Sequence, residues 1–138
     1  MLEKEKCDLS LYRLQRAKEL IADAESLFDR ESYKSSNNRA YYAVFSCMRA
    51  VLALDGEDFK KHSGVIQYFQ RTYIKTGIFD KKCSDIVMTA NMVRNASDYD
   101  DFYIASKEES LQQIQNAKEL YSVVEEHLKK RTEGNSSY

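Results

Sequence analysis

Proline is absent from this sequence, and glycine occurs only four times in 138 residues. Without proline, no position removes a backbone donor from a helical hydrogen-bond ladder. A β-sandwich of this length would need more turn-forming residues. The 43% hydrophobic share and the 31% charged share are typical of a folded globular chain. We therefore predict one all-α domain over residues 1–138, with its core at about residues 9–128 and a frayed tail at 132–138.

Cysteine and histidine are also scarce. Cys7, Cys47 and Cys83 are odd in number and far apart, so they indicate neither a disulfide framework nor a zinc site. The two histidines, His62 and His127, suggest no catalytic triad, although triads are recognised by geometry. We expect His127, which lies among charged neighbours, to be exposed and inert, and we expect no cofactor.

Long hydrophobic runs and an excess of one charge are missing as well. No apolar run approaches the roughly 20 residues that a membrane span needs. The first eight residues are charged and lack the apolar centre of a signal peptide. A net charge of −1 provides no overall basic field for nucleic acid, although a local basic patch is still allowed. We expect a cytoplasmic protein that does not bind membranes.

Apolar residues recur at spacings of three and four in five segments, which predicts five helices. They cover about residues 10–30, 36–54, 63–73, 80–95 and 106 onward. Short connections between them imply an up-and-down bundle of four to five helices. The second helix is apolar on most of its circumference. This pattern indicates either a homodimer interface or a position at the centre of the bundle.

Several polar residues predict where these helices begin and end. Ser35, Ser36 or Asn37 can cap the second helix, and Asp80 can cap the fourth. Gly56 can end the second helix in the left-handed conformation. Ser106 and Glu109 have the spacing of a capping box, which would open the last helix. The fourth helix should end near Arg94 or Asn95.

The most unusual segment runs from Arg94 to Tyr103 and combines three aspartates with aromatic residues. In one interpretation, Arg94 binds phosphate and a tyrosine ring stacks on a base. In the other, Arg94 pairs with Asp98, while Tyr99 and Phe102 are buried as packing. The aspartates lack the spacing and the central glycine of a calcium loop, so we expect no metal site.

A second candidate lies at the start of the third helix, where Lys61-His62-Ser63-Gly64 could hold an anion through backbone N–H groups and side chains. The alternative is a solvated loop in which Ser63 is only a helix cap. Arg39 and Arg49 are notable because they interrupt the apolar second helix.

Four stretches now form a joint pattern: Arg39-Ala-Tyr-Tyr-Ala-Val-Phe45, Arg49-Ala50, Lys61-His-Ser-Gly-Val65 and Arg94-x-x-x-Asp98-Tyr99. Their order and spacing over about residues 9–128 resemble the HEPN domain family in its small stand-alone prokaryotic form. The resemblance implies a four- to five-helix bundle, a homodimer, and nucleotide or RNA binding in a cleft between protomers. It also implies a minimal nucleotidyltransferase partner in a toxin–antitoxin or stress module.

Many HEPN proteins are metal-independent ribonucleases, whose motif is an arginine, a polar residue, and a histidine four to six positions after the arginine. Arg94 and Asn95 match this motif, but Tyr99, Asp100 or Asp101 stands where the histidine would be. Tyrosine, with a pKa near 10, is a poor base at neutral pH. The subgroup with Arg-x-x-x-Asp-Tyr is the closer match.

The resemblance therefore implies two sets of site residues. The catalytic candidates are Arg94, Asp98 and Tyr99, and the nucleotide-binding candidates are Arg94, Asn95, Arg39, His62 and Tyr103. Arg39 could instead be a structural ion-pair partner of Asp98.

Three hypotheses follow from these site residues. The chain is a nucleotide- or RNA-binding module, a divergent endoribonuclease that uses Arg94 with His62 or an aspartate, or a non-catalytic protein-interaction scaffold. In the last case, Tyr99 or Tyr103 could accept a nucleotidyl group from the partner enzyme.

Overall fold

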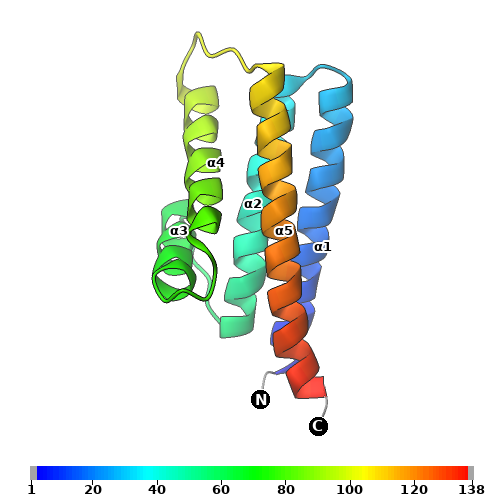
Figure 1. Ribbon diagram of the computed structural model, residues 1–138, viewed down its shortest axis with the longest axis vertical. Coiled ribbons are helices and arrows are strands. Elements are labelled where there is room, and N and C mark those ends of the chain that lie inside the picture. Colours follow the sequence, from blue (N-terminus) through cyan, green and yellow to red (C-terminus); the bar gives the residue numbers. More distant parts are fainter. Residues whose placement is uncertain (1–2, 137–138) are drawn as a thin grey trace.

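The chain folds into an up-and-down helical bundle, shown in Figure 1. The computed structural model describes residues 3–136, with side chains through residue 133. Its elements are α1 (Lys4–Asp29), α2 (Tyr33–Asp55), α3 (His62–Phe69), the π-helical segment η1 (Gln70–Ile74), α4 (Lys81–Tyr99) and α5 (Lys107–Ser136). The prediction of an all-α bundle is confirmed. Within residues 3–136, no helix is both long enough and apolar enough to cross a membrane.

Helix α2 lies at the centre of the bundle, in contact with α1, α3, α4 and α5. Most of its residues are buried, and its fully buried side chains include Val44, Cys47, Met48, Val51, Leu52 and Leu54. Packing against four other helices accounts for the large apolar surface of α2, for which the sequence left two interpretations. The prediction of a homodimer is not needed to explain it.

The start of α2 differs from the prediction. The helix begins at Tyr33, and the residue before it, Ser32, makes no side-chain cap hydrogen bond. Ser36 and Asn37 are buried inside the helix, so the prediction that they or Ser35 cap it was wrong. The Ser36 hydroxyl instead donates to the Ala24 carbonyl over 2.8 Å and ties α2 to α1. The Ser36 hydroxyl thus bonds a carbonyl on another helix and not a backbone N–H of its own helix, as a cap would.

Two of the other predicted helix ends are confirmed. Gly56 ends α2 with φ of 73°, a left-handed conformation that glycine adopts without steric cost. Asp80 caps α4, because its carboxylate accepts the Lys82 backbone N–H over 2.8 Å. The end of α4 was predicted wrongly: the helix passes Arg94 and continues to Tyr99, so Arg94 and Asp98 share one helix face.

The capping box at α5 is confirmed only in part. The Ser106 hydroxyl accepts the Glu109 backbone N–H over 3.0 Å. The Glu109 carboxylate does not return to Ser106; it accepts hydrogen bonds from Tyr103 and Asn37. At its other end, α5 continues through Ser136 and so enters the predicted tail. Residues 137–138 of that tail lie outside the described residues.

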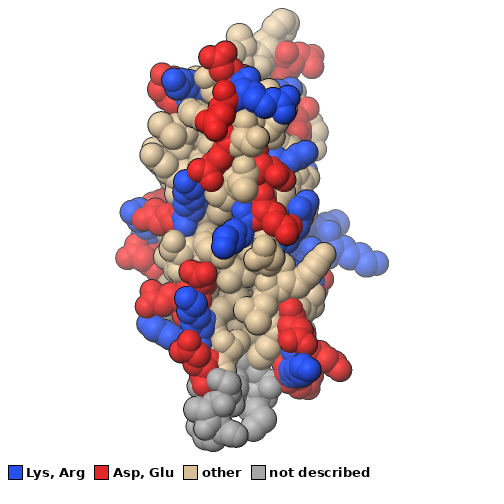
Figure 2. Space-filling model, turned by 90° about the vertical axis from the view of Figure 1, so that its right-hand side faces the viewer, with Lys and Arg blue, Asp and Glu red and all other residues tan. Residues whose placement is uncertain are grey.

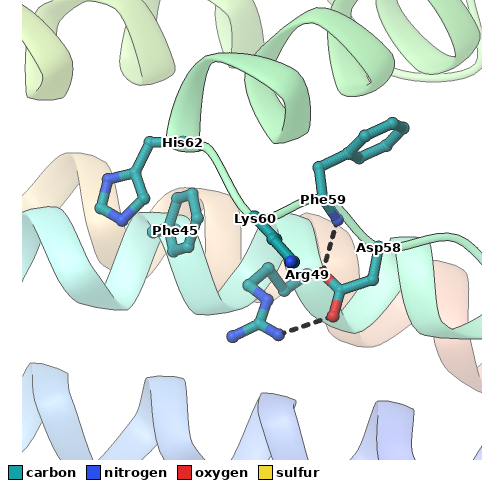
Figure 3. Close-up of a pocket in the computed structure, with 6 residues that line it drawn as sticks. All are labelled: Phe45, Arg49, Asp58, Phe59, Lys60 and His62. Atoms are coloured by element: carbon teal, nitrogen blue, oxygen red, sulfur yellow. Dashed lines mark hydrogen bonds and ion pairs between the residues drawn. The ribbon is translucent and has the colours of Figure 1, made fainter.

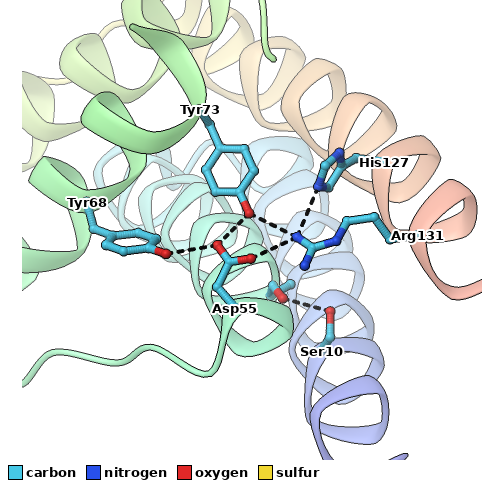
Figure 4. Close-up of polar contacts among 7 residues, drawn as sticks. Ser10, Asp55, Tyr68, Tyr73, His127 and Arg131 are labelled. Atoms are coloured by element: carbon cyan, nitrogen blue, oxygen red, sulfur yellow. Dashed lines mark hydrogen bonds and ion pairs between the residues drawn. The ribbon is translucent and has the colours of Figure 1, made fainter. Parts of the chain in front are cut away.

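A polar cluster ties the ends of α2, η1 and α5 together (Figure 4). Asp55 accepts hydrogen bonds from Tyr68 and Tyr73, and Arg131 donates to Asp55 over 2.9 Å and to Tyr73 over 3.0 Å. The ring of His127 packs edge-on against Tyr73. The prediction that His127 is exposed was wrong, since it is half-buried in this cluster. We call these five residues the sealed cluster.

The outer surface on the α1 side of the bundle carries both charges. Figure 2 shows Lys and Arg interspersed with Asp and Glu over this face. Alternating charges cancel at short range, so this face provides no basic field. Any anion-binding site must therefore come from a local arrangement elsewhere.

Candidate functional site

One face of α2 carries polar residues although the rest of the helix is buried. Arg39, Tyr42, Ser46 and Arg49 follow one another at spacings of three, four and three, so they form a stripe along the helix. The stripe borders a cavity of about 540 Å³, to which α1 contributes Arg16 and Asp23 and the start of α3 contributes His62. Three arginines and one histidine thus face one aspartate around this space.

Arg94, on α4, does not line this cavity, but it contacts His62, which does and which is 32 positions away in sequence. Its Nη1 lies 3.3 Å from His62 Nδ1, and its guanidinium carbon lies 4.9 Å from the Tyr41 ring centroid. A guanidinium over an aromatic face is held by attraction to the ring's π-electrons. The Arg94 Nε also pairs with Asp98 over 3.4 Å. The side chain keeps 24% of its surface exposed, so it is anchored but still reachable.

His62 is neutral at physiological pH in this arrangement. Burial, together with the positive charges of Arg94 and Arg49, lowers the pKa of His62 below its ordinary value. A guanidinium can only donate, so the contact with Arg94 favours the tautomer in which Nδ1 is an acceptor and the ring hydrogen lies on Nε2. The Tyr41 hydroxyl lies 2.8 Å from the same Nδ1. His62 is therefore assigned as a neutral ring that offers one N–H donor.

A second cavity, of about 420 Å³, adjoins the first and shares Phe45, Arg49 and His62 with it (Figure 3). A third, of about 280 Å³, lies between the start of α2 and the end of α4 and shares Arg39. We call the three together the α2 groove. Its two arginines on α2, Arg39 and Arg49, are ten residues apart, which is roughly 15 Å along a helix.

The structure brings some predicted site residues together at this groove. Arg94 and His62 are in contact, and Arg39 and Asp98 both line the third cavity. Arg39 hydrogen-bonds Asn38 over 3.2 Å and is not within ion-pair distance of Asp98, so the predicted structural ion pair between them was wrong.

Three other predicted residues lie apart from this cluster. Asn95 and Tyr99 are exposed on α4, Tyr99 by 82%. Tyr103 lies with Asn37 and Glu109 near the start of α5, where burial and the Glu109 carboxylate raise its pKa to about 12. The alternative interpretation is confirmed for the ion pair of Arg94 with Asp98. It was wrong in burying Tyr99 and Phe102 as packing, because Phe102 is 90% exposed.

Other residues of the groove were not predicted as site residues. The spacing from Arg39 to Arg49 could have identified Tyr42, because a polar stripe on an otherwise apolar helix marks an open face. Asp58 and Lys60 come from the loop after α2, and their place beside Arg49 depends on how that loop folds back. No local pattern predicts such an approach.

Comparison with known proteins is consistent with this fold. The HEPN domain family model matches residues 10–127. A UPF0332 protein of Thermotoga maritima is 34% identical over 125 residues, covering 91% of this chain and 93% of the relative. A protein of Methanocaldococcus jannaschii named "Putative toxin" is 32% identical over 97 residues, covering 70% of this chain and 66% of the relative. With the family model spanning most of its length, the chain belongs to the HEPN domain family.

Proposed function

We propose that this chain is a nucleotide- or RNA-binding module of a toxin–antitoxin system and that the α2 groove is its binding site. The observation that carries the proposal is the Arg94–His62 contact beside a cavity lined by Arg16, Arg39 and Arg49. Guanidinium groups bind phosphate oxygens in a planar fork, and the neutral His62 adds an N–H donor. The toxin name of two Methanocaldococcus jannaschii relatives supports this class of function.

Aromatic rings beside the cations favour a nucleic-acid ligand over a simple anion. Tyr42 is half-buried in the stripe and lines the main cavity, and its ring lies 5.9 Å from the Arg94 guanidinium carbon. Bases stack on such rings with little regard to sequence, while cations follow the phosphates. We expect Arg94 and Arg39 to contact phosphate and Tyr42 to contact a base.

The proposal includes a homodimer and a minimal nucleotidyltransferase as partner. Exposed Tyr99 would then be reachable for a partner enzyme, as the scaffold hypothesis requires. Light scattering on the purified chain measures the homodimer, and co-expression with the enzyme followed by mass spectrometry measures any nucleotidyl group on Tyr99. A monomeric chain that stays unmodified beside an active partner would contradict this part.

Binding is tested with a fluorescein-labelled single-stranded RNA of ten nucleotides, by anisotropy over a range of salt concentrations. We expect Arg94→Gln to weaken binding by tenfold or more and to reduce the salt dependence by about one phosphate contact. Arg30→Gln is the matched control. Arg30 is exposed just after α1, and its substitution removes the same charge as Arg94→Gln at a position that lines none of the three cavities of the groove. Equal affinities for the two variants would refute the proposal.

A metal-independent endoribonuclease is the second candidate function, favoured by the same Arg94–His62 contact. It ranks second because the Arg94 donor occupies Nδ1, and a cation at that position opposes protonation of the ring. The test is incubation of RNA with the chain in the presence of a chelator. Cleavage that both Arg94→Gln and His62→Gln abolish would establish catalysis, and intact RNA at high protein concentration would exclude it.

A further inference from the structure

One carboxylate lies where a phosphate of the ligand would bind. Asp58, in the loop between α2 and α3, pairs with Arg49 over 3.0 Å and with Arg13 over 3.2 Å. Both contacts use the same oxygen, Oδ2, so a single anionic atom bridges cations from α1 and α2. Carboxylate and phosphate oxygens accept from guanidinium groups in the same planar geometry. Asp58 therefore fills a phosphate-like position at the edge of the α2 groove.

The loop that carries Asp58 is anchored at several points. The Phe59 backbone N–H donates to the other Asp58 oxygen over 2.9 Å. The Phe59 ring packs on Tyr68, and a Cβ on Gly64 would meet the Cβ of Phe59 at 2.9 Å. Only glycine at position 64 leaves room for this approach. The contacts of Phe59 therefore hold the loop and fix the position of the Asp58 carboxylate. These contacts do not involve the arginines.

On the side of the groove, cations outnumber carboxylates around Asp58. Arg13 and Arg49 share this one carboxylate, and Lys60 lines the same cavity as Arg49 and Asp58 (Figure 3). On the other side, Arg13 and Asp58 border a separate cavity with Glu3, Glu5 and Glu57. The Arg49 Nε is buried and has no hydrogen-bond partner. Asp58 itself is 48% exposed, so water competes for it and the ion pairs are easily exchanged. On the groove side, the partly exposed Arg49 guanidinium and Lys60 therefore face a single carboxylate that a stronger anion can replace.

We propose that Arg49, Lys60 and Arg13 form a second phosphate subsite and that Asp58 is a built-in competitor that a ligand phosphate displaces. This inference rests on the proposed function, because it extends the same groove. It implies a ligand with at least two phosphates, one at Arg94 and one at Arg49. The ligand that we propose is an oligonucleotide strand, and a nucleoside monophosphate, with one phosphate, occupies only one of the two subsites.

The experiment measures the affinity of the same labelled ten-nucleotide RNA for Asp58→Asn. We expect roughly a threefold to tenfold gain in affinity and a steeper salt dependence, since two arginines become free for phosphate. Asp85→Asn is the matched control: Asp85 is exposed on α4, lines none of the three cavities of the groove, and its substitution removes the same charge. It should change affinity less than twofold.

A double-mutant cycle isolates the contact itself. In a chain that already carries Arg49→Gln, Asp58→Asn should change affinity much less than in the unaltered chain. Urea unfolding of each variant confirms that all are folded.

The outcomes separate the two proposals. If the unaltered chain binds RNA but Asp58→Asn matches Asp85→Asn or weakens binding, this inference is overturned and the proposed function stands. An undiminished effect of Asp58→Asn on the Arg49→Gln background also overturns it. If neither the unaltered chain nor any folded variant binds RNA, the proposed function fails and this inference with it.

Discussion

Two clusters in this bundle are built from the same residue types, but they differ in what surrounds them. The sealed cluster combines Asp55, Tyr68, Tyr73, His127 and Arg131. The Arg94 cluster combines Arg94 with an aspartate, a histidine and tyrosines. In the sealed cluster, the aspartate is 15% exposed and accepts three hydrogen bonds from its neighbours. In the Arg94 cluster, the aspartate is 37% exposed, and both it and His62 line cavities of the α2 groove.

The comparison shows that residue type does not separate a structural cluster from a binding site. The difference lies in whether cationic hydrogen-bond donors without a carboxylate acceptor lie next to a cavity. Asp55 satisfies the groups around it, whereas the groove concentrates Arg16, Arg39 and Arg49 with few carboxylates. Removing a partner from a sealed, well-bonded group should weaken the fold. The same change at the groove should weaken ligand binding.

The largest expected effect is on the sealed cluster. Asp55→Ala leaves the Arg131 guanidinium and two tyrosine hydroxyls without their acceptor, so we expect the free energy of unfolding to fall by about 3 kcal/mol. RNA affinity of the folded fraction should not change. The measurement is urea unfolding followed by circular dichroism.

Asp98→Ala is the control for that experiment. Its ion pair with Arg94 is partly exposed and spans 3.4 Å, so its loss should cost less than about 1 kcal/mol. A loss of stability as large as that of Asp55→Ala would remove the distinction between the two clusters.

A change in pH should have an intermediate effect on stability. Burial is the largest cause that lowers the pKa of both His127 and His62. A histidine that binds fewer protons in the folded state makes stability fall as pH decreases from about 6.5 toward the lowered pKa. Replacing His127 by Gln should flatten the dependence of unfolding free energy on pH in that window. Thermal or urea unfolding between pH 7 and pH 5 measures it.

The same acidification should act on ligand binding with the opposite sign. A bound phosphate favours the protonated form of His62, so RNA affinity should increase as pH falls below about 6.5. His62→Gln should abolish this increase, whereas His127→Gln should leave it intact. An increase that survives His62→Gln would show that another group at the groove takes up the proton.

The smallest effect on stability is expected from a change at Tyr99, which belongs to neither the sealed cluster nor the Arg94 cluster. Its side chain is 82% exposed, so Tyr99→Ala should change stability by less than about 0.5 kcal/mol. If Tyr99 stacks on a base, as one interpretation of the sequence holds, RNA affinity should fall while stability stays constant. Tyr12→Ala, at an exposed position of α1, is the control for loss of a surface ring.

Sequence patterns predicted the bundle better than they predicted its site. The helices, the left-handed end at Gly56 and the cap at Asp80 follow from interactions within one or two turns, so a local pattern reveals them. The cap predicted at Ser36 was wrong because its hydroxyl finds a carbonyl on another helix. Arg94 and His62 were both candidates, yet no spacing showed that they touch.

The sequence by itself determined which faces of the helices are apolar, where several helices end and, through its joint motifs, the family of the chain. Only the tertiary structure decided that Arg94 meets His62 across 32 positions and that Asp58 reaches Arg13 across 45. Helix periodicity is a local property, set by neighbours three and four residues apart. Contacts between distant residues depend on how whole helices and loops pack. This packing leaves the Asp55 side chain 15% exposed and the Asp98 side chain 37% exposed, although each pairs with an arginine.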